Sequence, residues 1–317
     1  MQVTKRGYGK INISLDVLGR REDGYHLLSM IMESVRIWDR IILTSRDDTG
    51  DQSQFSLTTY DRMNKQELGK EPIYQICEPC AMEDNLVYLG AKGILEMYQK
   101  LPESRKKAGF DPKDMVYDLV VYKDLPVAAG MAGGSADGAG AILAMNELLG
   151  NPFHQEELLD FGLSLGADVP YCILAGSYLA EGIGEKLTKL PPMPKAYVLL
   201  AKPPIAVSTK LVYQAVDAEK NIKHPDNKKV IEAMKAGDLK GMANYAGNVL
   251  SLVTPKEYPV VEEVRKAMLE EGAMLSLMTG SGPTVFGLYE KEEEAMACGR
   301  KIGKKFELEF LQVTTCL

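Results

Sequence analysis

Residues 123–150 read Lys-Asp-Leu-Pro-Val-Ala-Ala-Gly-Met-Ala-Gly-Gly-Ser-Ala-Asp-Gly-Ala-Gly-Ala-Ile-Leu-Ala-Met-Asn-Glu-Leu-Leu-Gly, and the fold depends on this stretch. The β-branched and aromatic residues just before it, 118–122, predict a strand. Apolar residues then recur at near-helical spacing from Ala139 until Gly150 and Pro152 end the pattern. The stretch is therefore predicted to hold a strand, a glycine-rich loop and a helix.

The loop in this stretch has the features of an anion site. Gly130, Gly133 and Gly134 lack Cβ atoms, so backbone N–H groups there can approach a ligand closely. We expect Ser135 to cap the following helix, whose free first-turn amides would add to the site. A polyphosphate is the expected anion, and a plain turn between packed elements is the alternative.

Two better-known phosphate motifs are missing from the chain. The sequence has no Gly-x-x-x-x-Gly-Lys-Ser/Thr, and the nearest approach, at 299–304, is one residue too short. It also lacks a complete Gly-x-Gly-x-x-Gly, so a nicotinamide or flavin site of the Rossmann type is not expected.

Composition indicates a globular protein without a membrane span. The chain has 317 residues, 45% of them apolar and 26% charged, which favours two domains. No apolar run approaches the roughly 18 residues of a membrane helix, and we expect a cytoplasmic protein. The net charge is −7, and acidic residues are interleaved with the basic ones, which argues against nucleic acid or a membrane as partner.

Five cysteines fit a reduced compartment. Cys77 and Cys80 have the Cys-x-x-Cys spacing, but no second pair follows and histidines are few. We therefore expect ordinary thiols and no protein-bound metal.

Several polar positions of interest lie between residues 8 and 168. Residues 8–17 alternate, so Lys10 and Asn12 project from the same face of a predicted strand. Residues 27–35 are predicted to be extended or helical, 37–44 a strand and 47–71 surface loops. A helix is predicted after Asn85 and another over 155–165, and Asp168 follows among apolar neighbours.

The clearest break in the chain lies at residues 182–194, which are rich in glycine and proline. Beyond it, strands are predicted at 196–201, 276–279, 284–289 and 306–313, and helices at 209–217, 228–236, 239–246, 259–270 and 291–304. Such mixing predicts an α+β sandwich with helices against one antiparallel sheet. A second glycine-rich turn lies within 278–286.

Five motifs occur together and in order along nearly the whole chain: Lys10-Ile-Asn12, Gly24-Tyr-His26, the glycine-rich stretch, Leu165-Gly-Ala-Asp-Val-Pro170 and Gly280-Ser-Gly-Pro283. This set resembles the GHMP kinases, named for galactose, homoserine, mevalonate and phosphomevalonate. Residues 19–26, the Gly-x-x-Gly-Gly-Ser-x-Asp form of the loop and residues 180–185 are most similar to the branch that acts on diphosphocytidyl methylerythritol.

The resemblance implies a two-domain α+β fold with the active site between the domains. Residues 1–185 would form an ATP-binding domain of ribosomal-protein-like fold, and 186–317 a ferredoxin-like substrate domain. With ATP and Mg²⁺, the enzyme would phosphorylate the 2-hydroxyl of diphosphocytidyl methylerythritol, in the non-mevalonate route to isoprenoid precursors. Asp168 matches the catalytic base of the family and Lys10 its partner, and this pairing suits phosphoryl transfer because the lysine can stabilise developing charge.

The resemblance also implies binding residues. For ATP they are Asn85, Lys123, Pro126, Val127, Ala128, Ala129, Gly130, Met131, Ala132, Gly133, Gly134, Ser135 and Ala136. For the acceptor substrate they are Asn12, Tyr25, His26, Thr209 and Tyr213, with the two tyrosines on either side of the cytosine ring. The chain departs from the family pattern at Met131, Ala132 and Ala136, and at the last a second serine is usual, so one candidate phosphate or magnesium contact is lost.

Two other functions remain open from the sequence alone. Another GHMP kinase, acting on homoserine or a mevalonate-like acid, would need a cationic pocket for a carboxylate. A catalytically inactive binding protein could use the same fold, but the retention of Lys10 and Asp168 argues against it. We expect small-molecule partners only and a monomer or weak homodimer.

Overall fold

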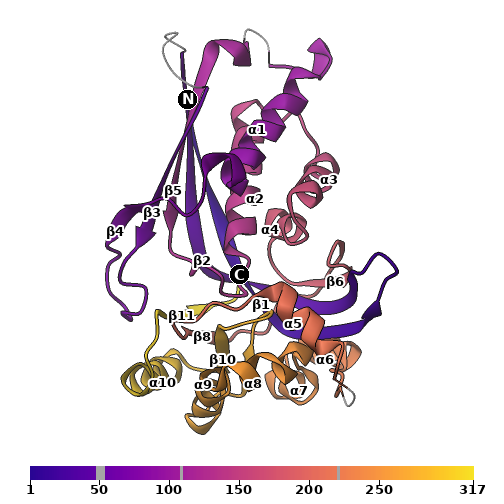
Figure 1. Ribbon diagram of the computed structural model, residues 1–317, viewed down its shortest axis with the longest axis vertical. Coiled ribbons are helices and arrows are strands. Elements are labelled where there is room, and N and C mark those ends of the chain that lie inside the picture. Colours follow the sequence, from indigo (N-terminus) through magenta and orange to yellow (C-terminus); the bar gives the residue numbers. More distant parts are fainter. Residues whose placement is uncertain (48–53, 108–109, 220–221) are drawn as a thin grey trace.

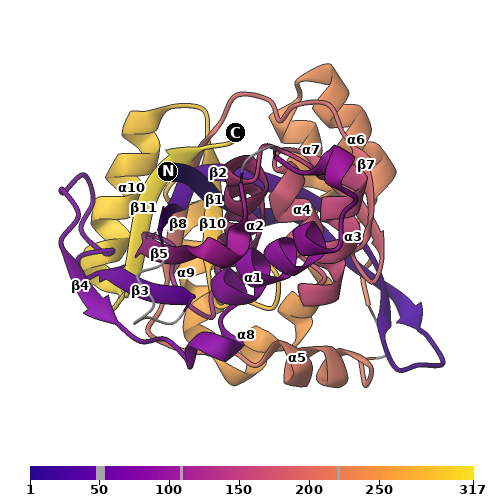
Figure 2. The same ribbon diagram turned by 90° about the horizontal axis from the view of Figure 1, so that it is seen from above.

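The computed structural model describes residues 1–47, 54–107, 110–219 and 222–317. Two α+β domains are stacked along the long axis of the molecule (Figure 1). Seen from above, the helices of the first domain overlie the second domain (Figure 2). This arrangement confirms the predicted α+β class with two domains.

The first domain is built on a seven-stranded sheet in the order β4-β3-β5-β2-β6-β7, with β1 paired to β2. Its strands are β1 (Gln2–Arg20), β2 (His26–Asp47), β3 (Phe55–Arg62), β4 (Tyr74–Cys77), β5 (Met115–Lys123), β6 (Tyr178–Gly182) and β7 (Lys186–Lys189). The β3–β5 pair is parallel and the other pairs are antiparallel.

The helices of this domain cover one face of the sheet (Figure 1). They are α1 (Leu86–Gln99), α2 (Gly133–Leu148), α3 (Gln155–Leu165) and α4 (Val169–Leu174), with short 3₁₀ helices η1 (Met82–Asp84), η2 (Glu103–Arg105) and η3 (Pro112–Asp114). α2 packs on β1 and β2, and α1 packs on α2. This packing is close and requires glycine at position 140, since an added Cβ there would lie only 2.6 Å from Ile41 Cδ1.

The β1–β2 hairpin is long enough to contact both domains. Three register shifts interrupt its pairing, at Tyr8/Lys10, Asn12/Ser14 and Val17/Gly19, and such irregularities bend and twist a hairpin. The hairpin reaches the second domain (Figure 1), where the Leu15 amide donates to the Gly247 carbonyl over 2.8 Å. The segments 27–35 and 37–44, which were predicted separately, are one continuous strand, β2.

The second domain has a four-stranded antiparallel sheet in the order β11-β8-β10-β9. Its strands are β8 (Tyr197–Lys202), β9 (Leu275–Met278), β10 (Val285–Tyr289) and β11 (Phe310–Thr315). Its helices are α5 (Thr209–Val216), α6 (Asn227–Ala236), α7 (Leu239–Tyr245), η4 (Val249–Leu252), α8 (Thr254–Glu257), α9 (Pro259–Glu270) and α10 (Glu292–Lys305). In the described part of the chain no helix has the length and apolarity to cross a membrane.

The predicted helices at 155–165, 209–217 and 259–270 are confirmed as α3, α5 and α9. The prediction of surface loops over 47–71 was wrong, because β3 lies there. Phe55 and Thr59 point into the interior, and the strand pairs with β5, but two inward residues in a polar segment gave too short a pattern to recognise. Residues 48–53 of that segment lie outside the described residues.

The division of the chain at residue 185 remains a prediction. The first sheet continues beyond this point, because β7 pairs with β6 as far as Lys189 opposite Tyr178. The proline-rich segment 190–194 then leads to β8 and the second sheet.

A buried carboxyl group lies where β2 meets the last residues of the chain. Glu33 is 0% exposed, Ser177 donates a hydrogen bond to its Oε2, and its Oε1 has no partner among the described residues. The neighbouring Ser34 carbonyl accepts from the Leu317 amide over 2.9 Å. Burial raises the pKa of Glu33 to about 7, against the opposing effect of its hydrogen bonds.

Glu33 makes the stability of the protein depend on pH in a defined direction. In the unfolded chain a glutamate has a pKa of about 4.3, so between that value and the folded pKa the native state binds more protons. The free energy of unfolding should therefore fall as pH rises from about 5 to about 8, by on the order of 3 kcal/mol from this group. Glu33→Gln keeps the shape of the side chain and does not titrate. Its free energy of unfolding, measured by urea denaturation across that pH range, should therefore lack this decrease. Parallel pH profiles for the variant and the wild type would contradict the assignment.

Candidate active site

A cavity of about 1070 Å³ lies between the two domains. This is at the upper end of the range for single small-molecule sites, so it can hold two ligands of moderate size. Most of the residues predicted from the sequence line it: Lys10, Asn12, Tyr25, His26, Asn85, Lys123, residues 126–130 and 132–135, Asp168, Thr209 and Tyr213. The structure thus brings together groups that are far apart in the sequence.

The glycine-rich loop enters α2 without a capping side chain. The helix begins at Gly133, and its N-cap is Ala132, in the left-handed conformation with a φ of 58°. The prediction that Ser135 is the N-cap was wrong, because the helix begins two residues earlier and Ser135 lies in its first turn. An N-cap that has no side-chain acceptor leaves first-turn N–H groups available to an anion in the cavity.

Two of the predicted ATP-binding residues do not line the cavity. The Met131 side chain is 1% exposed, and its carbonyl accepts the Lys10 amide over 3.1 Å. Ala136 is 0% exposed, and its carbonyl faces Gly7 of β1, where an added Cβ would lie 2.5 Å away. A hydroxyl at position 136 would therefore lie in this packed interior, so the replacement of the usual serine alters packing more than the cavity wall.

Lys10 and Asn12 project side by side from β1, as predicted. Lys10 Nζ donates to Asn12 Oδ1 over 2.7 Å, and Lys10 is only 5% exposed. Burial lowers the pKa of Lys10 below its usual value, while the negative charge of Asp168 opposes that effect. Asp168 lies at the start of α4, between α3 and the apolar first turn of α4, and faces the same cavity.

Thr279 connects this pair to both glycine-rich turns. Its Oγ1 accepts the Asn12 amide over 3.1 Å and donates to the Gly130 carbonyl over 3.1 Å. Gly130 has a φ of 71°, and a Cβ there would lie 2.2 Å from the Thr279 carbonyl oxygen. The second glycine-rich turn therefore holds the first in place across the domain interface.

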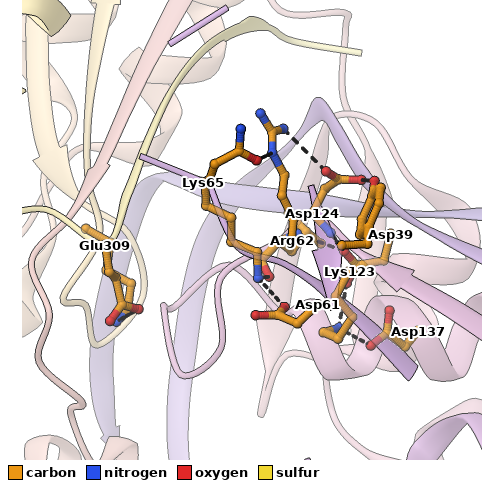
Figure 3. Close-up of polar contacts among 12 residues, drawn as sticks. Asp39, Asp61, Arg62, Lys65, Lys123, Asp124, Asp137 and Glu309 are labelled. Atoms are coloured by element: carbon orange, nitrogen blue, oxygen red, sulfur yellow. Dashed lines mark hydrogen bonds and ion pairs between the residues drawn. The ribbon is translucent and has the colours of Figure 1, made fainter. Parts of the chain in front are cut away.

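Lys123 lies on the cavity wall with its ammonium group between two carboxylates (Figure 3). Its Nζ is 2.6 Å from Asp39 Oδ2 and also contacts Asp137 Oδ2. Burial alone would lower the pKa of Lys123, but the charges of Asp137 and Asp39 outweigh it and raise the pKa. Burial raises the pKa of Asp137, and its Oδ1 has no hydrogen-bond partner among the described residues.

Asn85 lies where the cavity meets the start of α1. Its Oδ1 accepts from the Val87 amide over 2.9 Å, so it caps this helix. The side chain therefore has a structural role in addition to its place on the wall. Cys80 also lines this end of the cavity, and no group of three or more metal-ligating His, Cys, Asp or Glu side chains occurs in the described residues.

The opposite end of the cavity is aromatic. The His26 and Tyr213 rings lie 5.1 Å apart at an interplanar angle of 35°, and Tyr25 is 60% exposed. His26 Nε2 donates to Asp217 Oδ1 over 2.7 Å, which fixes the orientation of the ring. Thr209 Oγ1 is 2.9 Å from the Ser281 hydroxyl, so the start of α5 is connected to the second glycine-rich turn.

Thr279 and Asp39 were not recognised in the sequence as residues of the site, and Asp137 was identified only as the last residue of the loop motif. Thr279 adjoins a turn that was identified, and its role depends on contacts across the interface. Asp39 is an acidic residue within an apolar strand, and Asp137 one within a helix of small residues. An acidic residue in such surroundings is a usable signal, because burying an unpaired carboxylate is costly.

Comparisons with known proteins agree with the architecture. Residues 88–176 match the GHMP kinases N terminal domain, and residues 230–308 match the GHMP kinases C terminal domain.

Two relatives are named 4-diphosphocytidyl-2-C-methyl-D-erythritol kinase. One, from Lachnospira eligens, is 42% identical over 298 residues, which cover 94% of this chain and 92% of that protein. The other, from Lachnoclostridium phytofermentans, is 39% identical over 296 residues, which cover 92% of this chain and 90% of that protein.

Two solved structures share the fold over nearly the whole chain. A crystal structure of 4-(cytidine 5'-diphospho)-2C-methyl-D-erythritol kinase matches with a TM-score of 0.74 and 26% identity, covering 99% of both chains. A homoserine kinase from Cytophaga hutchinsonii matches with a TM-score of 0.68 and 18% identity, covering 100% of this chain and 94% of that chain, and this likeness concerns the fold alone.

Proposed function

Because this chain belongs to the GHMP kinase family, we propose that it transfers the γ-phosphoryl group of ATP to the 2-hydroxyl of 4-diphosphocytidyl-2-C-methyl-D-erythritol. The observation that carries the proposal is a single cavity bounded by the glycine-rich loop, Lys10 with Asp168, and an aromatic end. These are the three parts that a kinase for a cytidyl alcohol needs: a phosphate cradle, a transfer centre and a base-binding pocket. The reaction belongs to isoprenoid precursor synthesis, and we place the enzyme in the cytoplasm as a monomer or weak homodimer.

The transfer centre follows from the positions of Lys10 and Asp168. Asp168 accepts the proton of the 2-hydroxyl while the hydroxyl oxygen attacks the γ-phosphorus. The bond from that phosphorus to the β–γ bridging oxygen breaks, which releases ADP. Lys10 stabilises the negative charge on the transferring oxygens, and Asn12 holds Lys10 Nζ in place over 2.7 Å. Little covalent chemistry is required of the protein, so the accuracy of these positions decides the rate.

ATP would lie along the loop with its phosphates at the start of α2. The uncapped N–H groups of residues 133–135 would bind the phosphates, and Asn85 would lie toward the adenine. Two oxygen donors suited to Mg²⁺ lie beside the loop: the Ser135 hydroxyl and Asp137 Oδ1, for which the described residues offer no hydrogen-bond partner. Mg²⁺ brought by the nucleotide would neutralise charge on the β- and γ-phosphate oxygens.

The aromatic end supports a cytidyl acceptor over homoserine or a mevalonate-like acid. Tyr25 and Tyr213 would bind the two faces of the cytosine ring, and Thr209 and Asn12 would bind nearer the transferred group. Stacking does not distinguish cytosine from uracil. His26 would supply the contact to the base edge through its backbone or Nδ1, because its Nε2 is bound to Asp217.

Asp168→Asn tests the transfer centre. The amide cannot accept the hydroxyl proton, so turnover should fall about 10²- to 10⁴-fold while affinity for ATP stays close to that of the wild type. Steady-state ADP release at saturating substrates, together with calorimetric titration of a nonhydrolysable ATP analogue, measures both quantities. Wild-type turnover in a correctly folded variant would remove Asp168 from its role as base.

Tyr25→Ala and Tyr213→Ala test the cytidyl pocket. Stacking on an aromatic ring is worth about 1–3 kcal/mol per base, so each variant should raise KM for the cytidyl substrate roughly tenfold or more. KM for ATP should remain nearly constant, because both rings lie at the end of the cavity away from Asn85. The KM for ATP of each variant therefore serves as the internal control. A parallel rise in both constants, or none in either, would place the cytidyl pocket elsewhere.

A further inference from the structure

The three residues before the glycine-rich loop are held by charged side chains that come from other parts of the first domain (Figure 3). Lys123 ends β5, and Asp124 and Leu125 connect this strand to the loop that begins at Pro126. Neither Asp124 nor Leu125 lines the cavity, so the groups that fix them act on the loop from behind.

Asp39 of β2 makes the densest set of these contacts. The residue is 0% exposed. Its Oδ2 accepts from Lys123 Nζ over 2.6 Å, and its Oδ1 accepts the Asp124 amide over 2.6 Å and the Leu125 amide over 2.8 Å. One carboxylate therefore satisfies the lysine and two consecutive backbone donors at the point where the loop leaves the sheet.

Other side chains hold two of these residues, Asp124 and Leu125. Lys65 Nζ donates to the Leu125 carbonyl over 3.1 Å. Tyr74 Oη donates to Asp124 Oδ2 over 2.8 Å, and Arg62 is paired with the same carboxylate at 3.4 Å. Asp39 and these groups together therefore fix the direction in which the chain enters the loop.

We propose that Asp39 is a positioning residue of the phosphate loop and that Lys123 acts as a strut between Asp39 and Asp137, without direct contact to the nucleotide. This inference rests on the proposed kinase function and adds a residue outside the cavity to it. Lys123 is only 6% exposed, and its ammonium group already has two carboxylate partners, so it has little capacity left for a phosphate.

The hydrogen-bond chemistry explains why aspartate is needed at position 39. An ionised carboxylate accepts hydrogen bonds at both oxygens, whereas an asparagine amide accepts at one end and donates at the other. In Asp39→Asn, either the amide nitrogen faces the Lys123 ammonium or it faces the two backbone N–H groups. One set of contacts is lost in both orientations, although the shape of the side chain is retained.

Asp39→Asn should therefore weaken nucleotide binding without abolishing the fold. We expect the dissociation constant for a nonhydrolysable ATP analogue and KM for ATP to rise at least tenfold, because small misplacements of binding groups have effects of this size. KM for the cytidyl acceptor should change less than about threefold, since its pocket lies at the other end of the cavity. A purely structural role would move both constants together, or only the melting temperature.

Asp118→Asn is the matched control. It makes the same chemical change on β5, in a residue that pairs with Arg46 over 2.9 Å and accepts from the Ser56 hydroxyl over 2.6 Å, away from the cavity. Its nucleotide affinity should equal that of the wild type. If the affinity of Asp39→Asn matches that of Asp118→Asn, the inference is overturned while the proposed kinase function stands. Failure of the wild type to bind the ATP analogue would instead overturn the proposed function.

A double-variant comparison decides the role of Lys123. If Lys123 acts through Asp39, the effects of the two substitutions should not add. The combined Asp39→Asn and Lys123→Met protein should then have about the same dissociation constant for the ATP analogue as the single variant that binds it less tightly. If Lys123 contacts the nucleotide directly, the two fold-changes should multiply, and the strut is refuted.

Hydrogen exchange of the wild-type protein supplies a test that needs no variant. The amides of Asp124 and Leu125 are bound only by Asp39 among the described residues. Both amides should therefore exchange slowly in the nucleotide-free protein. Rapid exchange at these two amides would contradict the positioning role of Asp39 even if Asp39→Asn failed to fold.

Discussion

The close packing of α2 on β1 is the constraint on which the site depends. Gly7 leaves room for the Ala136 carbonyl, which an added Cβ would meet at 2.5 Å, and the Lys10 amide donates to the Met131 carbonyl. The helix can therefore lie against the strand backbone to backbone. As a result, the start of α2 and the side chains of Lys10 and Asn12 face one cavity, and a bulkier residue at position 7 would separate them.

The second domain completes a site that the first domain cannot form alone. Thr279 binds both the Asn12 amide and the Gly130 carbonyl, so the second glycine-rich turn holds β1 and the first glycine-rich loop in register. The β1–β2 hairpin provides a further connection through Leu15 and the Gly247 carbonyl. Because the cavity is bounded by both domains, a change in their relative position would alter the surroundings of the glycine-rich loop, of Lys10 with Asp168, and of the aromatic end together.

Much of this arrangement could be predicted from the sequence, because several motifs carry local signals. Alternation in β1 placed Lys10 and Asn12 on one face, and the glycines marked the loop. Ser135 was wrongly predicted as the N-cap, because its residue type is a common cap and the left-handed backbone of Ala132 leaves no trace in the sequence. The strand β3 was missed for a different reason, because only two of its residues point inward and its pairing with β5 is non-local. The contacts of Asp39 and Thr279 join residues that are distant in sequence, and no spacing rule reveals them.

The most direct test of the account is the choice of acceptor. Purified protein is incubated with Mg-ATP and, in separate reactions, diphosphocytidyl methylerythritol, homoserine or mevalonate, and ADP release and the phosphorylated product are measured. We expect ADP to form in equal amount to a product phosphorylated at the 2-oxygen of the methylerythritol unit, with the highest kcat/KM for the diphosphocytidyl alcohol. A higher kcat/KM for homoserine or mevalonate, or ADP release that does not depend on any of the three alcohols, would contradict it.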